Sequence, residues 1–257
     1  MRVPTNVVRV GWAGSKTMPR RGSEITARAH VARVIVLTVV AVLVSGSSAQ
    51  ADDPRDAMNN AIRDTAKART AKLAIKQQVT TRGRTTEIIT TGTAVSGDHD
   101  LVTTGETGPA RVVAVGTRVK ERWPNDNTQA WREHTRAAPT QTSALGPLTL
   151  KDGTVVGDPR LYTSVADAGT ETIASVSTRK IVGQLSLAAV ATAMQVSAAD
   201  ATRMAQWSGT LTVWIAPDGR VARNVVHLVI PSASGPTTID AQIDLSDLDA
   251  PLIVTLP

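Results

Sequence analysis

Three histidines lie beyond residue 51, and their spacing is not typical of a metal site. His99, His134 and His227 are too far apart in the sequence for any two to lie one turn apart on a helix. His99 stands between two aspartates in a predicted turn, and His227 alternates with apolar neighbours in a predicted strand, where we expect it to face solvent or a polar lining. We therefore predict no metal and no cofactor.

Other catalytic patterns are also missing. No Gly-x-Ser-x-Gly elbow occurs, and Ser208-Gly209 opens a predicted strand. Asp244, Asp247 and Asp249 cluster near the end of the chain, where turn and cap roles are the default interpretation. No glycine-rich nucleotide loop is present. We predict that the protein is not an enzyme, although a triad assembled in space leaves a hydrolase as the weakest alternative.

The positive hypothesis is a cavity for an apolar ligand. A curved antiparallel sheet with one apolar face either packs on helices as core or leaves a cleft. For any one aliphatic residue, ordinary core is the better interpretation. Trp123 and Trp131 flank one hairpin and either stand at a cavity mouth or seal an edge. The predicted lining is Leu211, Val213, Ile215, Val226 and Leu228, with Trp123 and Trp131 near the entrance.

Periodicity predicts which elements would position these residues. Acidic residues in the first turn and small residues at helical spacing indicate a helix over 52–70. From Lys72 the period changes to two, with Leu73, Ile75, Gln77 and Val79 on one face of a strand. Further strands are predicted at 85–96, 101–107, 110–115, 118–123, 128–134, 160–165, 170–184, 210–216, 220–230 and 237–245.

Turns and helices complete the predicted order. Turns are expected at 82–84, 97–100, 124–127 and 217–219, and an irregular loop at 135–158. Ser186 and Ser197 are predicted to cap helices over 186–194 and 197–205. The fold class is therefore α+β: a strongly curved antiparallel sheet with packed helices.

The first 51 residues are typical of a secretory signal peptide. Basic residues precede an apolar run over 34–44, and Ala49-Gln50-Ala51 follows. The run is shorter than the ~20 residues of a membrane-spanning helix. We predict cleavage between Ala51 and Asp52, one domain over 52–257, and a location outside the cytoplasm. Met18 would begin a signal peptide of more ordinary length.

Charge and cysteine content narrow the partners. Residues 1–51 hold seven Lys or Arg and one Glu, which matches the net charge of +6 of the whole chain, so residues 52–257 are neutral overall. The electrostatic argument for a nucleic-acid partner therefore disappears, and none is predicted. The chain has no cysteine. Disulfides, thiolate metal sites and lipid attachment through a cysteine at the cleavage site are thus excluded.

Three segments resemble an actinobacterial protein family. The run LTVWIAPDGRVARNVV (211–226) resembles the late hairpin of the LppX/LprG lipoproteins, which belong to the LolA-like and LolB-like periplasmic lipid carriers. ERWPNDNTQAWRE (121–133) looks like one of the family's Trp-bearing strand pairs, and STRKIVGQLSL (177–187) is similar to the segment leading into its central helix. The resemblance spans nearly all of residues 52–257.

This resemblance implies a half-open barrel with helices on its concave face and a cavity for acylated lipids. A family member would bind an acylated lipid or glycolipid and move it between membrane and cell surface, with an envelope membrane protein as a further candidate partner. We expect a monomer. Ala51-Asp52 stands where the family carries a lipobox cysteine, so release rather than lipid anchoring is expected. The alternative is an envelope protein-binding or stress-sensing module that uses the same concave surface.

Overall fold

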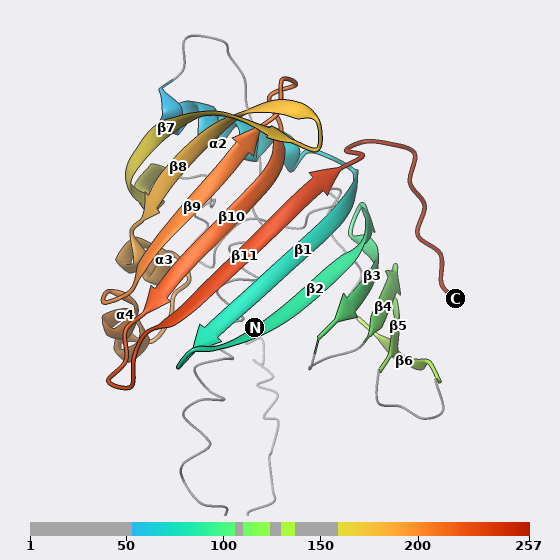
Figure 1. Ribbon diagram of the computed structural model, residues 1–257. Helices are drawn as coiled ribbons and strands as arrows, with labels where there is room; N and C mark the ends of the chain where they lie inside the picture. Colours follow the sequence, from blue (N-terminus) through green and yellow to red (C-terminus); the bar gives the residue numbers. More distant parts are fainter. Residues whose placement is uncertain (1–52, 106–109, 124–129, 137–158) are drawn as a thin grey trace, which may run out of the picture.

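One antiparallel sheet dominates the molecule (Figure 1). The computed structural model describes residues 53–105, 110–123, 130–136 and 159–257. The proposed signal peptide, the cleavage site at Ala51 and Asp52 and most of the predicted 135–158 loop lie outside these residues. The described strands are β1 (Thr70–Thr81), β2 (Arg84–Val95), β3 (Asp98–Thr104), β4 (Arg111–Val115), β5 (Arg118–Arg122), β6 (Arg132–Thr135), β7 (Tyr162–Ile173), β8 (Val176–Leu185), β9 (Ser208–Ile215), β10 (Val221–Ile230) and β11 (Thr237–Ser246).

The sheet has eleven strands in the order β6-β5-β4-β3-β2-β1-β11-β10-β9-β8-β7. It is not closed, because β6 and β7 form its two edges. Strand β11 pairs with β1 and so joins the early meander to the late one. Figure 1 shows the strong twist expected of a large open sheet. The predicted α+β class, with a strongly curved antiparallel sheet, is confirmed.

Helices lie beside β7–β10. Helix α2 (Pro54–Thr65) is capped by Asp53, whose carboxylate accepts the Arg55 N–H at 2.9 Å. It ends at Thr65, five residues before the predicted end, and β1 begins at Thr70. Ser186 caps α3 (Leu187–Ala193) and Ser197 caps α4 (Ala198–Met204), as predicted. A short 3-10 helix, η1 (Pro159–Leu161), precedes β7.

The strand register defines two faces of the sheet. We call the face toward α2 the inner face and the opposite one the outer face. A Cβ on Gly183 would stand 3.3 Å from Met58 of α2, which places Gly183 on the inner face. In the register, Gly183 lies opposite Leu211, and Leu211 lies opposite Val226. The same row continues through Ala241 of β11 to Gln77 of β1. The main core lies between this inner face and the helices.

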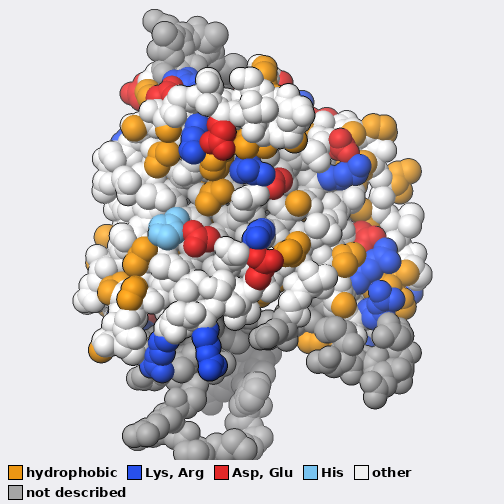
Figure 2. Space-filling view, viewed as in Figure 1, with side chains coloured by type: hydrophobic (Ala, Val, Ile, Leu, Met, Phe, Trp, Pro, Cys, Tyr) orange, Lys and Arg blue, Asp and Glu red, His pale blue; other side chains and the backbone are white. Residues whose placement is uncertain are grey.

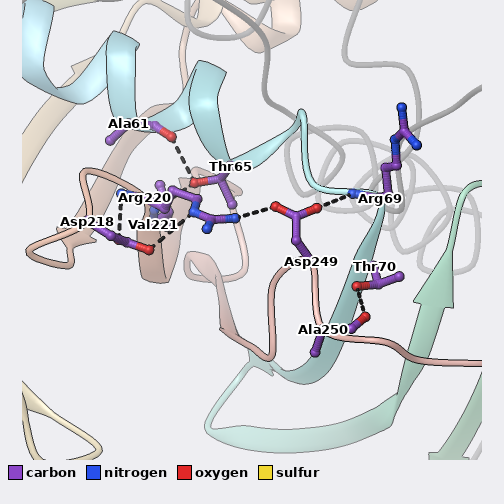
Figure 3. Close-up of polar contacts among 9 residues, drawn as sticks. All are labelled: Ala61, Thr65, Arg69, Thr70, Asp218, Arg220, Val221, Asp249 and Ala250. Atoms are coloured by element: carbon purple, nitrogen blue, oxygen red, sulfur yellow. Dashed lines mark hydrogen bonds and ion pairs between the residues drawn. The ribbon is translucent and has the colours of Figure 1, made fainter.

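A polar junction attaches α2 to the sheet at one end (Figure 3). The buried hydroxyl of Thr65 accepts the Val221 N–H at 2.6 Å and donates to the Ala61 carbonyl at 2.8 Å. Nearby, the Asp249 carboxylate accepts the Arg69 N–H at 2.8 Å and pairs with Arg220 at 2.6 Å. The end of α2, the start of β10 and the segment after β11 are therefore held together by hydrogen bonds.

The β7–β8 turn corrects a prediction. Strands were expected at 160–165 and 170–184, with a break near Gly169. Instead β7 continues to Ile173, and the turn lies at Ala174 and Ser175, whose φ angles are 47° and 69°. Gly169, with φ 86°, occupies a bulge where the register shifts between Asp167 and Thr170. Because a bulge lets a strand continue past extra residues, β7 runs through the gap that was predicted between the two strands.

His99 corrects a second prediction. The expected turn over 97–100 is tighter, because Ser96 and Gly97 take the positive φ angles and β3 begins at Asp98. His99 is therefore a strand residue that pairs with Ala94 and Ala114.

Candidate functional site

The structure brings together the five aliphatic residues of the predicted lining. Leu211, Val213 and Ile215 of β9 lie on the inner face, as do Val226 and Leu228 of β10. All five are buried and belong to the core that includes α2 and α3. Their burial satisfies the ordinary-core interpretation, and contact with a ligand stays a prediction.

The inner face continues beyond the strands that α2 contacts. Helix α2 packs against β7, β8, β9 and β10. Further along the sheet, Leu73, Ile75 and Val79 of β1 and Ile88 of β2 are only partly buried. Val79 lies opposite Ile239, which lies opposite Leu228, so this row of apolar side chains runs from the core to β1. This surface offers an apolar ligand partly exposed aliphatic side chains next to a closed core.

Two amide side chains interrupt this apolar surface. Gln77 of β1 lies opposite Ala241 and Ile88, and Asn224 of β10 lies opposite Val213 and Ile243. Gln77 Nε2 and Asn224 Oδ1 are buried and have no hydrogen-bond partner. The same is true of Asn59 Oδ1 on α2. Buried polar atoms are almost always paired, so these positions differ from the surrounding core.

The outer face carries interspersed basic and acidic side chains, as Figure 2 shows. The Nζ atom of Lys180 lies 5.0 Å from the ring centroid of Trp214 on β9. The indole N–H of Trp214 donates to the Glu171 carboxylate at 3.0 Å. Hydrogen bonds from Lys180 and then from Trp214 lower the pKa of Glu171. His227 hydrogen-bonds Asp240 through Nδ1 at 2.6 Å and is partly exposed, so it faces solvent as expected.

The predicted acidic cluster does not converge on one point. Asp244 pairs with Arg223, Asp247 with Lys72 at 2.6 Å, and Asp249 with Arg220. These are structural ion pairs, and Asp249 also receives the backbone N–H of Arg69. Within the described ranges, no group of three or more His, Asp or Glu side chains could hold a metal ion.

Trp123 and Trp131 lie in the other half of the sheet. Trp123 follows β5 and Trp131 precedes β6, while β1–β4 and β11 separate these strands from β9 and β10. Trp131 packs under the guanidinium groups of Arg111 and Arg122, at 5.8 Å and 5.6 Å. The structure thus does not bring them together with the five aliphatic residues, and their place at an entrance stays a prediction.

No family model matches this chain, and no curated protein does. Solved structures do. The lipoprotein LppX of Mycobacterium tuberculosis has a TM-score of 0.50 and 18% identity, over 79% of this chain and 98% of LppX. The chain shares the LppX fold. LprF from Mycobacterium bovis has a TM-score of 0.43 and 14% identity, over 79% of this chain and 96% of LprF.

The LppX fold confirms the half-open barrel that the sequence resemblance implied.

Among the described helices, none is long and apolar enough to cross a membrane.

Sequence reasoning missed part of the candidate site. The alternation of Leu73, Ile75, Gln77 and Val79 was recognised as one face of a strand. The partial exposure of that face was not predicted, because it depends on where the helices end. Asn224 was not singled out, because a single polar residue in an apolar strand carries no signal of burial.

Proposed function

We propose that the protein binds an acylated lipid or lipoconjugate on the inner face of its sheet and carries it within the cell envelope. The observation that supports this most is the largely apolar inner face, closed over β9 and β10 and partly exposed over β1 and β2. An acyl chain laid there would leave water, at ~0.8 kcal/mol per methylene. The family resemblance and the LppX fold are consistent with this function.

The proposal also includes export of the chain and carriage without a chemical reaction. The signal peptide would export the chain, and cleavage after Ala51 would release it without a cysteine-linked lipid. Carriage needs no catalytic group, since burial of acyl chains grows with their length and needs no reacting side chain.

Two neighbouring isoleucines of β2 provide a matched test. Ile88 lies opposite Gln77 on the inner face, and Ile89 lies opposite Lys76 on the outer face. Ile88→Lys would place a charge where the acyl chain should lie, and we expect it to reduce uptake of a fluorescent fatty acid at least tenfold. Ile89→Lys, at a residue that is 37% exposed, should leave uptake unchanged.

Circular dichroism would establish that both variants fold. Equal uptake by the two folded variants would contradict the proposed binding face. If Ile88→Lys does not fold, Ile88→Ser tests the same position by removing apolar area without adding charge.

A further inference from the structure

Gln77 and Asn224 occupy related positions on the inner face. They lie on either side of β11: Gln77 is opposite Ala241, and Asn224 is opposite Ile243, two residues along the same strand. Two strand spacings and a two-residue offset place their Cα atoms about 12 Å apart. Between them lie only aliphatic side chains of β11.

Neither amide has a hydrogen-bond partner at its buried atom, which is Nε2 in Gln77 and Oδ1 in Asn224. Both residues are partly exposed as a whole, but a buried polar atom without a partner destabilises a folded protein, and an aliphatic group in its place would not. The cost is offset if another molecule hydrogen-bonds these atoms. The two amides lie in the apolar surface that is proposed to hold the acyl chains, so the ligand itself is a candidate for that partner.

The charges around the two amides restrict the chemistry of the ligand. The residues opposite the two amides in the register are uncharged: Ala241 and Ile88 for Gln77, and Val213 and Ile243 for Asn224. Arg179, on the inner face of β8, is paired with Asp167. Among these strand residues, a phosphate or carboxylate beside the two amides would meet no unpaired positive charge, which is strongly unfavourable. The polar part of the ligand that reaches these residues should therefore be neutral.

A hydroxyl group satisfies either position. One hydroxyl can accept a hydrogen bond from the Gln77 amide nitrogen, and a second can donate one to the Asn224 amide oxygen. Because an amide can present either its nitrogen or its oxygen, a group that both donates and accepts fits either orientation.

We infer that Gln77 and Asn224 bind the hydroxyl groups of a neutral acyl lipid, such as an acylglycerol or an acylated sugar. This inference rests on the proposed function and adds the class of ligand and the residues that select it. The acyl chains would lie on the aliphatic residues, and the two amides would distinguish hydroxylated lipids from equally apolar lipids that lack hydroxyls.

Two probes with the same acyl chain test this selection. Monolauroylglycerol has two free hydroxyls, and methyl laurate has none. Binding of each is measured by displacement of the neutral fluorescent probe N-phenyl-1-naphthylamine from the purified protein. The wild-type protein should prefer monolauroylglycerol by roughly three- to tenfold, as expected for one or two neutral hydrogen bonds.

Leucine substitutions identify the residues responsible. Gln77→Leu and Asn224→Leu should each reduce the preference severalfold while leaving the affinity for methyl laurate unchanged or higher. Gln78→Leu is the matched control, because Gln78 lies on the outer face and donates to Glu87 at 2.7 Å. If either leucine variant fails to fold, Gln77→Met and Asn224→Val replace it.

The outcomes separate this inference from the proposed function. If the wild-type protein binds both probes equally, or the variants keep the preference, the amides bind water and the inference is overturned while lipid binding stands. If the wild-type protein binds neither probe nor a fluorescent fatty acid, both the inference and the proposed function fail.

Discussion

At the scale of single residues, His99 couples stability to pH. On β3, His99 pairs with Ala94 of β2 on one side and with Ala114 of β4 on the other. Its pKa is lowered below 6.5, mainly because the imidazole is buried and secondly because of the positive charge of Arg136. Asp98 and Asp100 oppose this shift only in part. A lowered pKa means that the folded protein binds a proton at His99 less readily than the unfolded chain does.

The sign of the resulting pH dependence follows from linkage. The stability associated with neutral His99 is present above pH 6.5 and is lost as the pH falls through the lower pKa of the folded state. We predict that His99→Leu makes the free energy of unfolding less dependent on pH between 7.5 and 5. Urea denaturation of both proteins at several pH values measures this. Identical slopes in the two proteins would contradict the prediction.

At the scale of elements, one buried hydroxyl joins the end of α2 to the start of β10, in addition to the apolar contacts of the core. Without the Thr65 hydroxyl, the N–H of Val221 would lose its acceptor in the interior. We predict that Thr65→Val, which keeps the shape of the side chain, lowers the free energy of unfolding by about 1–3 kcal/mol. Thr65→Ser keeps the hydroxyl and should lose clearly less. Equal urea midpoints for wild type and Thr65→Val would refute this role.

The elements also show where local sequence patterns suffice. Ser186 and Ser197 were identified as helix caps because a cap forms within a few residues, and the alternation over 210–216 correctly placed β9. The β7–β8 turn was misplaced because Ala174 and Ser175 adopt positive φ angles that their types do not favour. The pairing of Ile173 with Val176 closes the turn over these two residues, and a local pattern does not show where that pairing ends.

At the scale of the whole molecule, the proposed function depends on a strand pairing that no local pattern predicts. Residues of β1 and β11 are far apart in the sequence, yet their pairing extends the apolar inner face past the strands that α2 contacts. The five predicted lining residues were correctly placed on one face by their alternation. Whether an aliphatic residue is closed core or open surface depends on which helices cover it, so the partly exposed residues of β1 and β2 emerged only from the fold.

The most direct test of lipid carriage is native mass spectrometry. The full chain would be expressed in an actinobacterial host, and the exported protein would be purified without detergent and extracted with organic solvent for lipid analysis. We predict an acylated species bound at a defined stoichiometry, together with an N-terminus at Asp52. A mass that corresponds to the protein alone, with no uptake when envelope lipids are added, would contradict lipid carriage and favour a protein-binding module.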